Sequence, residues 1–217
     1  IFASTGTGMW EAALTNTLAP GDRVLAVRFG QFSHLFIDTA ERLGFKVDVI
    51  DLEWGEAADP ARLAEALAAD RAHAIEAVLL VHNETATGVT NDVADVREAI
   101  DGTGHPALLI VDGVSSIGSL AFRFDDWGVD VAICGSQKGF MMPAGLGMLC
   151  VSSKAMALVE HGRFPRAYFD LRPQVVHNDQ GYFPYTPPLA HLFGLREALD
   201  MVAEQGMPAI VARHARL

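Results

Sequence analysis

Residues 107–112 read ALLIVD, and residues 77–82 read AVLLVH. Each run is apolar at consecutive positions and ends in one polar residue. A strand with this pattern is buried on both faces, which is typical of a parallel sheet with helices on either side. These two runs therefore predict the central strands of an α/β protein.

Similar runs extend outward from these two stretches and alternate with longer helical patterns. This order predicts a doubly wound, three-layer α/β/α fold around a mostly parallel sheet. Glycine and proline mark where the helical patterns end and begin. The predicted strands are Arg23–Arg28, Lys46–Ile50, Glu76–His82, Ala107–Asp112, Asp130–Cys134 and Leu146–Ser152, and the predicted helices are Gly8–Leu18, Ser33–Leu43, Pro60–Arg71 and Asp92–Asp101.

The alternation stops after Ser153. Residues 164–188 are rich in proline and aromatic residues, which predicts that this segment is mostly loop. Residues 189–206, LAHLFGLREALDMVAEQG, then predict a long amphipathic helix that Gly206 closes. The chain begins without a methionine and stops within a helical pattern, so we expect both ends to be cut from a longer protein.

The chain is acidic, with 16 basic and 27 acidic residues and a net charge of −11. This balance argues against nucleic acid or an anionic membrane as a partner, because both require a basic surface. No apolar run reaches the roughly 18 residues of a membrane span. Cys134 and Cys150 fall in predicted strands, so we expect two buried thiols and a reducing compartment, either the cytoplasm or, in a eukaryote, the peroxisome.

Three features with distinct chemistry stand at or near the ends of predicted strands, where ligands of open α/β sheets bind. Residues 5–8, TGTG, precede a helix whose free N–H groups and dipole favour a phosphate. Asp112 ends a buried strand, where a carboxylate is costly unless a cation accepts it. Lys138 lies between two strands, so we expect dehydration to lower its pKa and its amine to form a Schiff base with an aldehyde.

Together these features suit pyridoxal 5′-phosphate (PLP). This cofactor carries a phosphate, a pyridine nitrogen that needs an anionic partner, and an aldehyde that reacts with lysine. Phe32 could stack on its flat ring, and Thr85 could donate a hydrogen bond to a ring oxygen. Taken singly, each residue also has a purely structural explanation, such as a helix cap, a surface lysine or a packed phenylalanine.

Five stretches carry a resemblance to a known family: STGTGMWEAALTNTLAPGD (4–22), HNETATGV (82–89), VDGVSSIG (111–118), GSQKGFMMPAGL (135–146) and GYFPYTP (181–187). They make the chain resemble class V aminotransferases of fold type I, especially the serine–glyoxylate and alanine–glyoxylate aminotransferases. The resemblance implies the large PLP-binding domain of the aspartate aminotransferase-like fold for residues 1–188, without its N-terminal part. Residues 189–217 would then form the helix that leads to an absent C-terminal small domain.

The resemblance also implies an activity and a set of residue roles. The enzyme would move an amino group from serine or alanine to glyoxylate or pyruvate with ping-pong kinetics. Lys138 would hold the cofactor and move the substrate's Cα proton, while Asp112 would pair with the pyridinium nitrogen. The other implied cofactor-binding residues are Thr5, Gly6, Thr7, Phe32, Thr85, Val114 and Gln137, together with Tyr182 and Thr186 from the neighbouring subunit of a homodimer.

Three alternatives remain open at this point. A reaction of the cysteine desulfurase type needs a mobile nucleophilic thiol. The two strand cysteines are poor candidates for it, but a segment outside this chain could supply one. A 2-aminoethylphosphonate transaminase would differ in pocket residues outside this chain. A non-catalytic α/β binding module would show no lysine-dependent absorption band with PLP. No metal site is expected, because the histidines are scattered and no H-E-x-x-H motif occurs.

Overall fold

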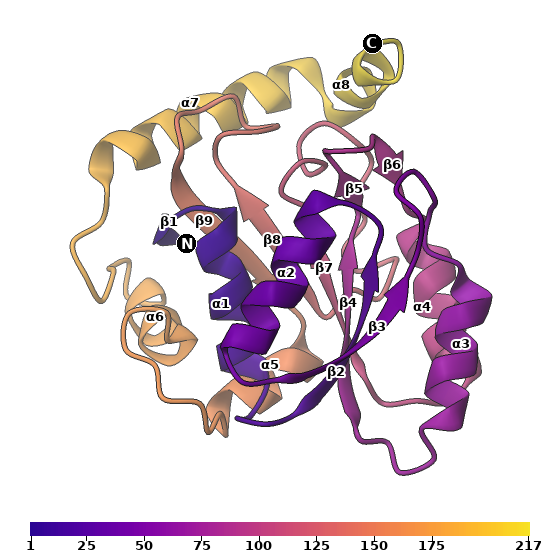
Figure 1. The fold of residues 1–217 in the computed structure, drawn as a ribbon. Helices are drawn as coiled ribbons and strands as arrows, with labels where there is room; N and C mark the ends of the chain where they lie inside the picture. Colours follow the sequence, from indigo (N-terminus) through magenta and orange to yellow (C-terminus); the bar gives the residue numbers. More distant parts are fainter.

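The structure, a computed structural model, describes residues 1–217 and is built on a seven-stranded sheet. The strands of this sheet are β1 (Phe2–Ser4), β2 (Arg23–Arg28), β3 (Lys46–Asp51), β4 (Ile75–Val81), β7 (Leu108–Asp112), β8 (Val131–Gly135) and β9 (Gly145–Val151). Their order is β1-β9-β8-β7-β4-β2-β3 (Figure 1). A separate hairpin pairs β5 (Asn83–Glu84) with β6 (Val89–Thr90).

The six predicted strands are confirmed, each with ends within one residue of the prediction. The pairs β2–β3, β2–β4, β4–β7 and β7–β8 are parallel, whereas β9 is antiparallel to both β8 and β1. All five residues of β7 are buried, and β7 pairs with β4 on one side and β8 on the other. The apolar runs quoted first are thus the centre of the sheet, as their burial pattern predicts.

The helices are α1 (Gly6–Thr17), α2 (Gln31–Arg42), α3 (Pro60–Ala69), α4 (Val93–Gly102), α5 (Ser153–Glu160), α6 (Leu171–Asn178), α7 (Leu189–Gln205) and α8 (Met207–His214). The four helices predicted before residue 102 are confirmed, and α7 ends at Gly206 as expected. The two short helices α5 and α6 were not predicted, and α6 lies in the segment that was expected to be mostly loop. In α6, the side chain of Asp170 caps the first turn, where Pro173 is tolerated because a first-turn N–H needs no helical partner.

The helices cover both faces of the sheet, which confirms the three-layer fold. The crossover from β2 through α2 to β3 runs in one direction across the sheet, whereas those through α3 and α4 run in the other. Because such crossovers are right-handed, α2 lies on one face and α3 and α4 lie on the opposite face. Helix α1 lies beside α2, where the Trp10 and Phe36 rings stack with centroids 5.3 Å apart (Figure 1).

Two carboxylates secure the edge of the sheet where the parallel strands begin, here named the amino edge. Asp130 is buried and accepts hydrogen bonds from the Leu109 amide (2.9 Å) and the Ser152 hydroxyl (3.0 Å). Asp70 accepts one from the Ile75 amide at 2.7 Å. These bonds satisfy backbone N–H groups at the starts of β4 and β7. Neither carboxylate lies at the opposite edge, where the parallel strands end.

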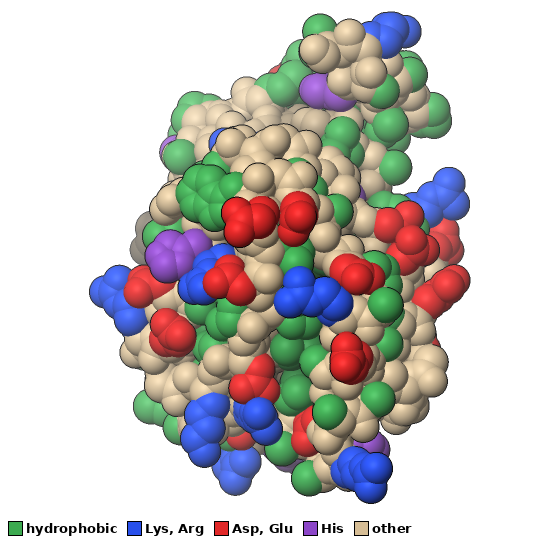
Figure 2. Space-filling view, turned by 45° about the vertical axis from the view of Figure 1, so that its right-hand side comes forward, with side chains coloured by type: hydrophobic (Ala, Val, Ile, Leu, Met, Phe, Trp, Pro, Cys, Tyr) green, Lys and Arg blue, Asp and Glu red, His purple; other side chains and the backbone are tan.

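The surface agrees with the mixed, acidic composition. On the face shown in Figure 2, acidic and basic side chains are interspersed, and no continuous basic area stands out. None of the eight helices combines the length and the apolarity that crossing a membrane would require.

Arg166 ties the segment between α5 and α6 to the end of α1. Its side chain is only 3% exposed. The guanidinium donates hydrogen bonds to the carbonyl oxygens of Thr15 (2.9 Å), Phe164 (3.3 Å) and Val159 (3.4 Å). Its Nε lies 3.5 Å from the Asp170 carboxylate. A buried cation thus satisfies backbone carbonyls that no secondary structure pairs.

Replacing Arg166 with methionine should lower the free energy of unfolding by about 3 kcal/mol, because three carbonyls and one carboxylate lose a buried partner. Arg172→Met is the matched control. Arg172 pairs with the same Asp170 but is 48% exposed, so its loss should cost under about 1 kcal/mol. Urea denaturation of both variants measures the difference, and equal losses would contradict the anchoring role.

Candidate active site

A cleft opens at the carboxyl ends of β4 and β7, the edge opposite Asp70 and Asp130. Its walls bring together residues from four separate segments: the first turn of α2, the segment after β4, the turn after β7 and the turn after β8. The lining residues are Phe32, Val81, Asn83, Thr85, Asp112, Val114, Ser115 and Lys138. Five of them, Phe32, Thr85, Asp112, Val114 and Lys138, were singled out from the sequence as cofactor-binding candidates.

Asp112 is the buried acid of this cleft and is only 4% exposed. Its Oδ1 accepts a hydrogen bond from the Val114 amide at 2.8 Å, and its Oδ2 accepts one from Trp10 Nε1 at 2.9 Å. None of the chain's ion pairs includes it. Burial raises the pKa of Asp112 to about 6, although these two hydrogen bonds oppose the rise. A largely buried carboxylate thus faces the cleft without a cationic partner.

Lys138 lies in the turn that follows β8 and is exposed. The prediction that two core strands would enclose and dehydrate it was wrong. Residues 136–144 separate β8 from β9 and carry the lysine out of the sheet into the wall of the cleft. Its amine is therefore accessible to a molecule that enters from solvent.

Glycines on either side of Lys138 explain where this turn lies. A Cβ atom on Gly139 would come within 2.3 Å of the Ile117 carbonyl oxygen, and one on Gly118 would come within 3.1 Å of the Gly139 Cα. The turn after β8 therefore packs backbone against backbone on the turn after β7. This contact brings the lysine and Asp112 into one cleft.

The N-terminus of α1 adjoins the same cleft and has the features of a phosphate seat. Thr5 is the N-cap residue, yet its hydroxyl makes no capping hydrogen bond, and both Thr5 and Thr7 are exposed. A Cβ on Gly6 would lie 2.5 Å from Val114 Cγ2, so glycine allows the helix to approach the cleft. Gln137 Oε1 is buried and has no hydrogen-bond partner. The predicted Thr5, Gly6, Thr7 and Gln137 thus retain unused hydrogen-bonding capacity at or near the N-terminus of α1.

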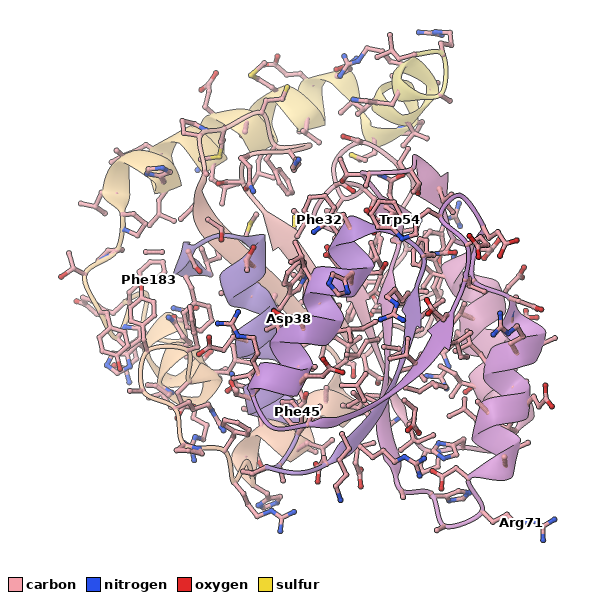
Figure 3. All side chains as sticks on the ribbon, in the orientation of Figure 1. Phe32, Asp38, Phe45, Trp54, Arg71 and Phe183 are labelled. Atoms are coloured by element: carbon pink, nitrogen blue, oxygen red, sulfur yellow. The ribbon has the colours of Figure 1, made fainter.

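Tyr182 and Thr186 do not line the cleft of their own chain. Thr186 lines a separate small cavity with Phe183 and Tyr185. Tyr182 is 68% exposed. Figure 3 shows the labelled Phe183 well away from the labelled Phe32. These two predicted residues are therefore free to contact something other than their own cleft.

Glu84 supports the wall of the cleft and was not expected from the sequence. Its Oε2 accepts hydrogen bonds from the amides of Phe32 (2.9 Å) and Ser33 (3.0 Å), and its Oε1 accepts one from Ala86 (3.1 Å). The side chain is fully buried, and a Cβ on Gly30 would lie 2.3 Å from its Cγ. Glu84 precedes Thr85 in HNETATG, but no local pattern indicates its partners about fifty residues earlier.

Replacing Glu84 with glutamine should destabilise the protein by about 2 kcal/mol. Glutamine keeps the size, but its NH₂ group would face backbone N–H donors in either orientation and leave them unpaired. Glu65→Gln, on the exposed side of α3, is the matched control and should change stability by less than about 0.5 kcal/mol. Thermal unfolding compares the two variants. Similar transition temperatures would show that the hydrogen bonds from the backbone amides to Glu84 do not stabilise the fold.

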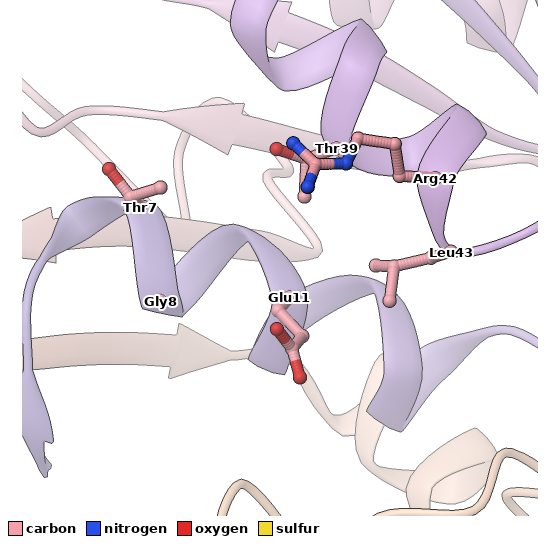
Figure 4. A pocket seen from close by; sticks show the side chains of 6 residues that line it. All are labelled: Thr7, Gly8, Glu11, Thr39, Arg42 and Leu43. Atoms are coloured by element: carbon pink, nitrogen blue, oxygen red, sulfur yellow. The ribbon is translucent and has the colours of Figure 1, made fainter.

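A larger hollow of about 400 Å³ lies between α1 and α2 (Figure 4). Its lining residues are Thr7, Gly8, Glu11, Thr39, Arg42 and Leu43. It contains neither the accessible amine nor the buried acid, and it shares only Thr7 with the predicted site. The groups able to do chemistry together therefore lie in the smaller cleft.

The two cysteines do not provide a reactive thiolate. Cys134 is buried, and burial raises the pKa of its thiol to about 12. Cys150 is exposed, contrary to the prediction, because β1 pairs only with Gly145–Gly147 and leaves the rest of β9 at an open edge. Partial burial still raises the pKa of the Cys150 thiol. A raised pKa disfavours the nucleophilic form that desulfuration needs.

Comparison with known proteins agrees with this geometry. The profile of the family described as Aminotransferase class-V matches residues 1–217. The chain belongs to the class V aminotransferase family. Class V aminotransferases depend on PLP. The cofactor of the family is therefore the one that the sequence predicted from Asp112 and Lys138, which line one cleft.

Several of the similar proteins are named as glyoxylate aminotransferases. The chain is 59% identical to the serine–glyoxylate aminotransferase of Methylorubrum extorquens and 51% identical to the L-aspartate–glyoxylate aminotransferase of Paracoccus denitrificans. Both matches cover 100% of this chain and 55% of the relative, so the chain spans about half the length of these class V aminotransferases. The alanine–glyoxylate aminotransferase structure from Nostoc sp. superposes with a TM-score of 0.89 at 32% identity, covering 98% of this chain and 56% of that one.

Proposed function

We propose that this chain is the cofactor-binding part of a PLP-dependent transaminase that moves an amino group from serine or alanine to glyoxylate or pyruvate. The observation that carries the proposal is the pairing of groups in one cleft. A buried carboxylate without an ionic partner, Asp112, lines the same cleft as the exposed amine of Lys138, and the N-terminus of α1 adjoins it. The names of the most similar relatives support glyoxylate as the acceptor.

The residues of the cleft fit the parts of PLP one by one. Asp112 would hold the ring nitrogen, and Lys138 would bind the aldehyde carbon. Phe32 and Val114 would pack against the ring, and Thr85 would bond to the ring oxygen. The phosphate would be held by Thr5, Gly6, Thr7 and Gln137. When bound, PLP supplies an electron-withdrawing ring that stabilises negative charge on the substrate's Cα.

Two side chains would do the proton chemistry. The Lys138 Nζ would take the proton from the substrate's Cα and deliver it to the former aldehyde carbon of the cofactor, because it is the accessible base in the cleft. Asp112, with a pKa of about 6, is mostly ionised at pH 7, and its negative charge would keep the ring nitrogen protonated. Lys138 would thus transfer the proton, whereas Asp112 would supply a fixed negative charge.

We also propose a homodimer in which Tyr182 and Thr186 complete the phosphate site of the other subunit. Their exposure and their separation from their own cleft support this arrangement. Residues 1–188 would form the large domain, and residues 189–217 would lead to a further domain. The two unpaired thiols support a reducing compartment, for which we propose the cytoplasm.

A donor panel tests the activity. The full-length protein, of which this chain would be the cofactor-binding part, is loaded with PLP and given serine, alanine or aspartate with either glyoxylate or pyruvate, and the keto acids formed are quantified. We expect glyoxylate with serine or alanine to be among the productive pairs. Donor without acceptor should release about one keto acid per site, as ping-pong kinetics requires. If no donor yields a keto acid, the proposed transamination is wrong.

A further inference from the structure

Trp10 reaches the acid of the cleft from a different element. It lies in α1, and its Nε1–H donates to Asp112 Oδ2 at 2.9 Å across 102 positions of sequence. Trp10 is 3% exposed and Asp112 is 4% exposed, so water does not compete for this bond. The indole also stacks on Phe36 with an interplanar angle of 18°. The donor is therefore held in place by the bond on one side and by the stack on the other.

The two donors on Asp112 are not alike. The Val114 amide comes from the same turn and follows any movement of the acid, whereas Trp10 fixes the carboxylate relative to α1. Trp10 is also the one side chain that donates a hydrogen bond to Asp112. A carboxylate oxygen has about two lone-pair positions, so each oxygen keeps one free for a further donor. Asp112 can therefore accept a further hydrogen bond, such as one from a ring N–H, while the indole stays bound.

We propose that Trp10 is a positioning residue that keeps Asp112 ionised and oriented, so that the proton between Asp112 and the cofactor's ring nitrogen stays on the nitrogen. This inference rests on the proposed PLP site. In a buried site, a carboxylate without donors becomes a stronger base and would take that proton itself. An indole N–H stabilises the carboxylate's charge and makes it the weaker base of the pair.

Other charged and titratable groups act on the same acid. Glu84 and Cys134 favour its protonated form when they are charged, whereas Lys138 favours its ionised form. Lys138 would be engaged by the cofactor when the site is loaded. When the cofactor is bound, the indole N–H is therefore the side-chain group that still stabilises the ionised form of Asp112.

The variant Trp10→Phe removes the N–H and keeps an aromatic ring to stack on Phe36. The protein is loaded with PLP labelled with ¹⁵N in the ring, and the nitrogen's chemical shift reports its protonation. We expect the ratio of protonated to neutral nitrogen at pH 7 to fall about tenfold relative to the unmodified protein. Phe36→Leu weakens the stack but leaves the donor, so it should keep the ratio of the unmodified protein.

The outcomes separate this inference from the proposed function. If labelled PLP does not bind at Lys138 in the unmodified protein, the cofactor site itself is wrong. If PLP binds but Trp10→Phe gives an unchanged ¹⁵N shift, only the role of Trp10 is overturned.

A second measurement covers a Trp10→Phe protein that does not fold. In the PLP-free unmodified protein, the indole N–H proton resonance of Trp10 should move with pH around the Asp112 pKa of about 6. Asp112→Asn should abolish this movement. An indole resonance that ignores pH would overturn the proposed coupling.

Discussion

Lys138→Ala should eliminate the visible absorption band that PLP acquires when it binds a lysine. The transaminase rate should fall by roughly 10²–10⁴-fold or more, because one substitution removes both the anchoring amine and the Cα base. Stability should change by less than about 0.5 kcal/mol, since the side chain is exposed and the turn is held by backbone contacts at Gly139. Absorption spectra with added PLP and a rate assay measure both effects.

Lys46→Ala is the matched control. Lys46 is also exposed, but it begins β3 at the amino edge of the sheet. It should leave the absorption band and the rate unchanged. If Lys138→Ala retains the band while Lys46→Ala loses it, the cofactor attachment has been assigned to the wrong strand end.

Asp112→Asn should have opposite effects on activity and on stability. Activity should fall roughly 10²–10³-fold, because the neutral amide cannot hold a positive charge on the ring nitrogen. The PLP-free protein should become more stable at pH 8. Ionising the buried carboxylate costs up to about 3 kcal/mol, given a pKa raised from 3.8 to about 6, and the lost indole bond offsets part of this gain.

The pH dependence of this gain has a definite sign. Since the folded form binds the Asp112 proton more tightly than the unfolded chain does, the unmodified protein loses stability as pH rises from about 4 to about 6. The asparagine variant lacks this loss. The stability difference between them should therefore widen over that interval and be complete by pH 8. Urea denaturation at pH 4 and pH 8 measures it, and a difference that does not widen would contradict the burial of an unpaired acid.

The sheet could be predicted because its signal is local. Consecutive apolar residues in β4 and β7 indicate strands buried on both faces, and the helical patterns between them indicate a doubly wound α/β fold. The order of the strands and the short strand β1 were not predicted. The convergence of Asp112, Lys138 and Thr85 could be predicted for the same reason, since parallel strands end at one edge. Knowing the order of the elements was enough to place these residues near one another.

Long-range contacts carry no comparable signal. The exposure of Lys138 depends on a backbone contact between Gly118 and Gly139, which the spacing of neither glycine reveals. The bonds from Trp10 to Asp112 and from Phe32 to Glu84 join residues 102 and 52 positions apart. Side chains of these types are most often core or surface residues, so only the packed structure shows that they support the cleft.

The division of labour between the two edges of the sheet has a practical side. Asp70 and Asp130 bond to backbone groups at the starts of strands, far along β4 and β7 from the residues that would touch a cofactor. The amino edge of the sheet is therefore the region to redesign when a more thermostable biocatalyst is wanted. Stabilising substitutions chosen at this edge should leave the chemistry of the cleft unchanged.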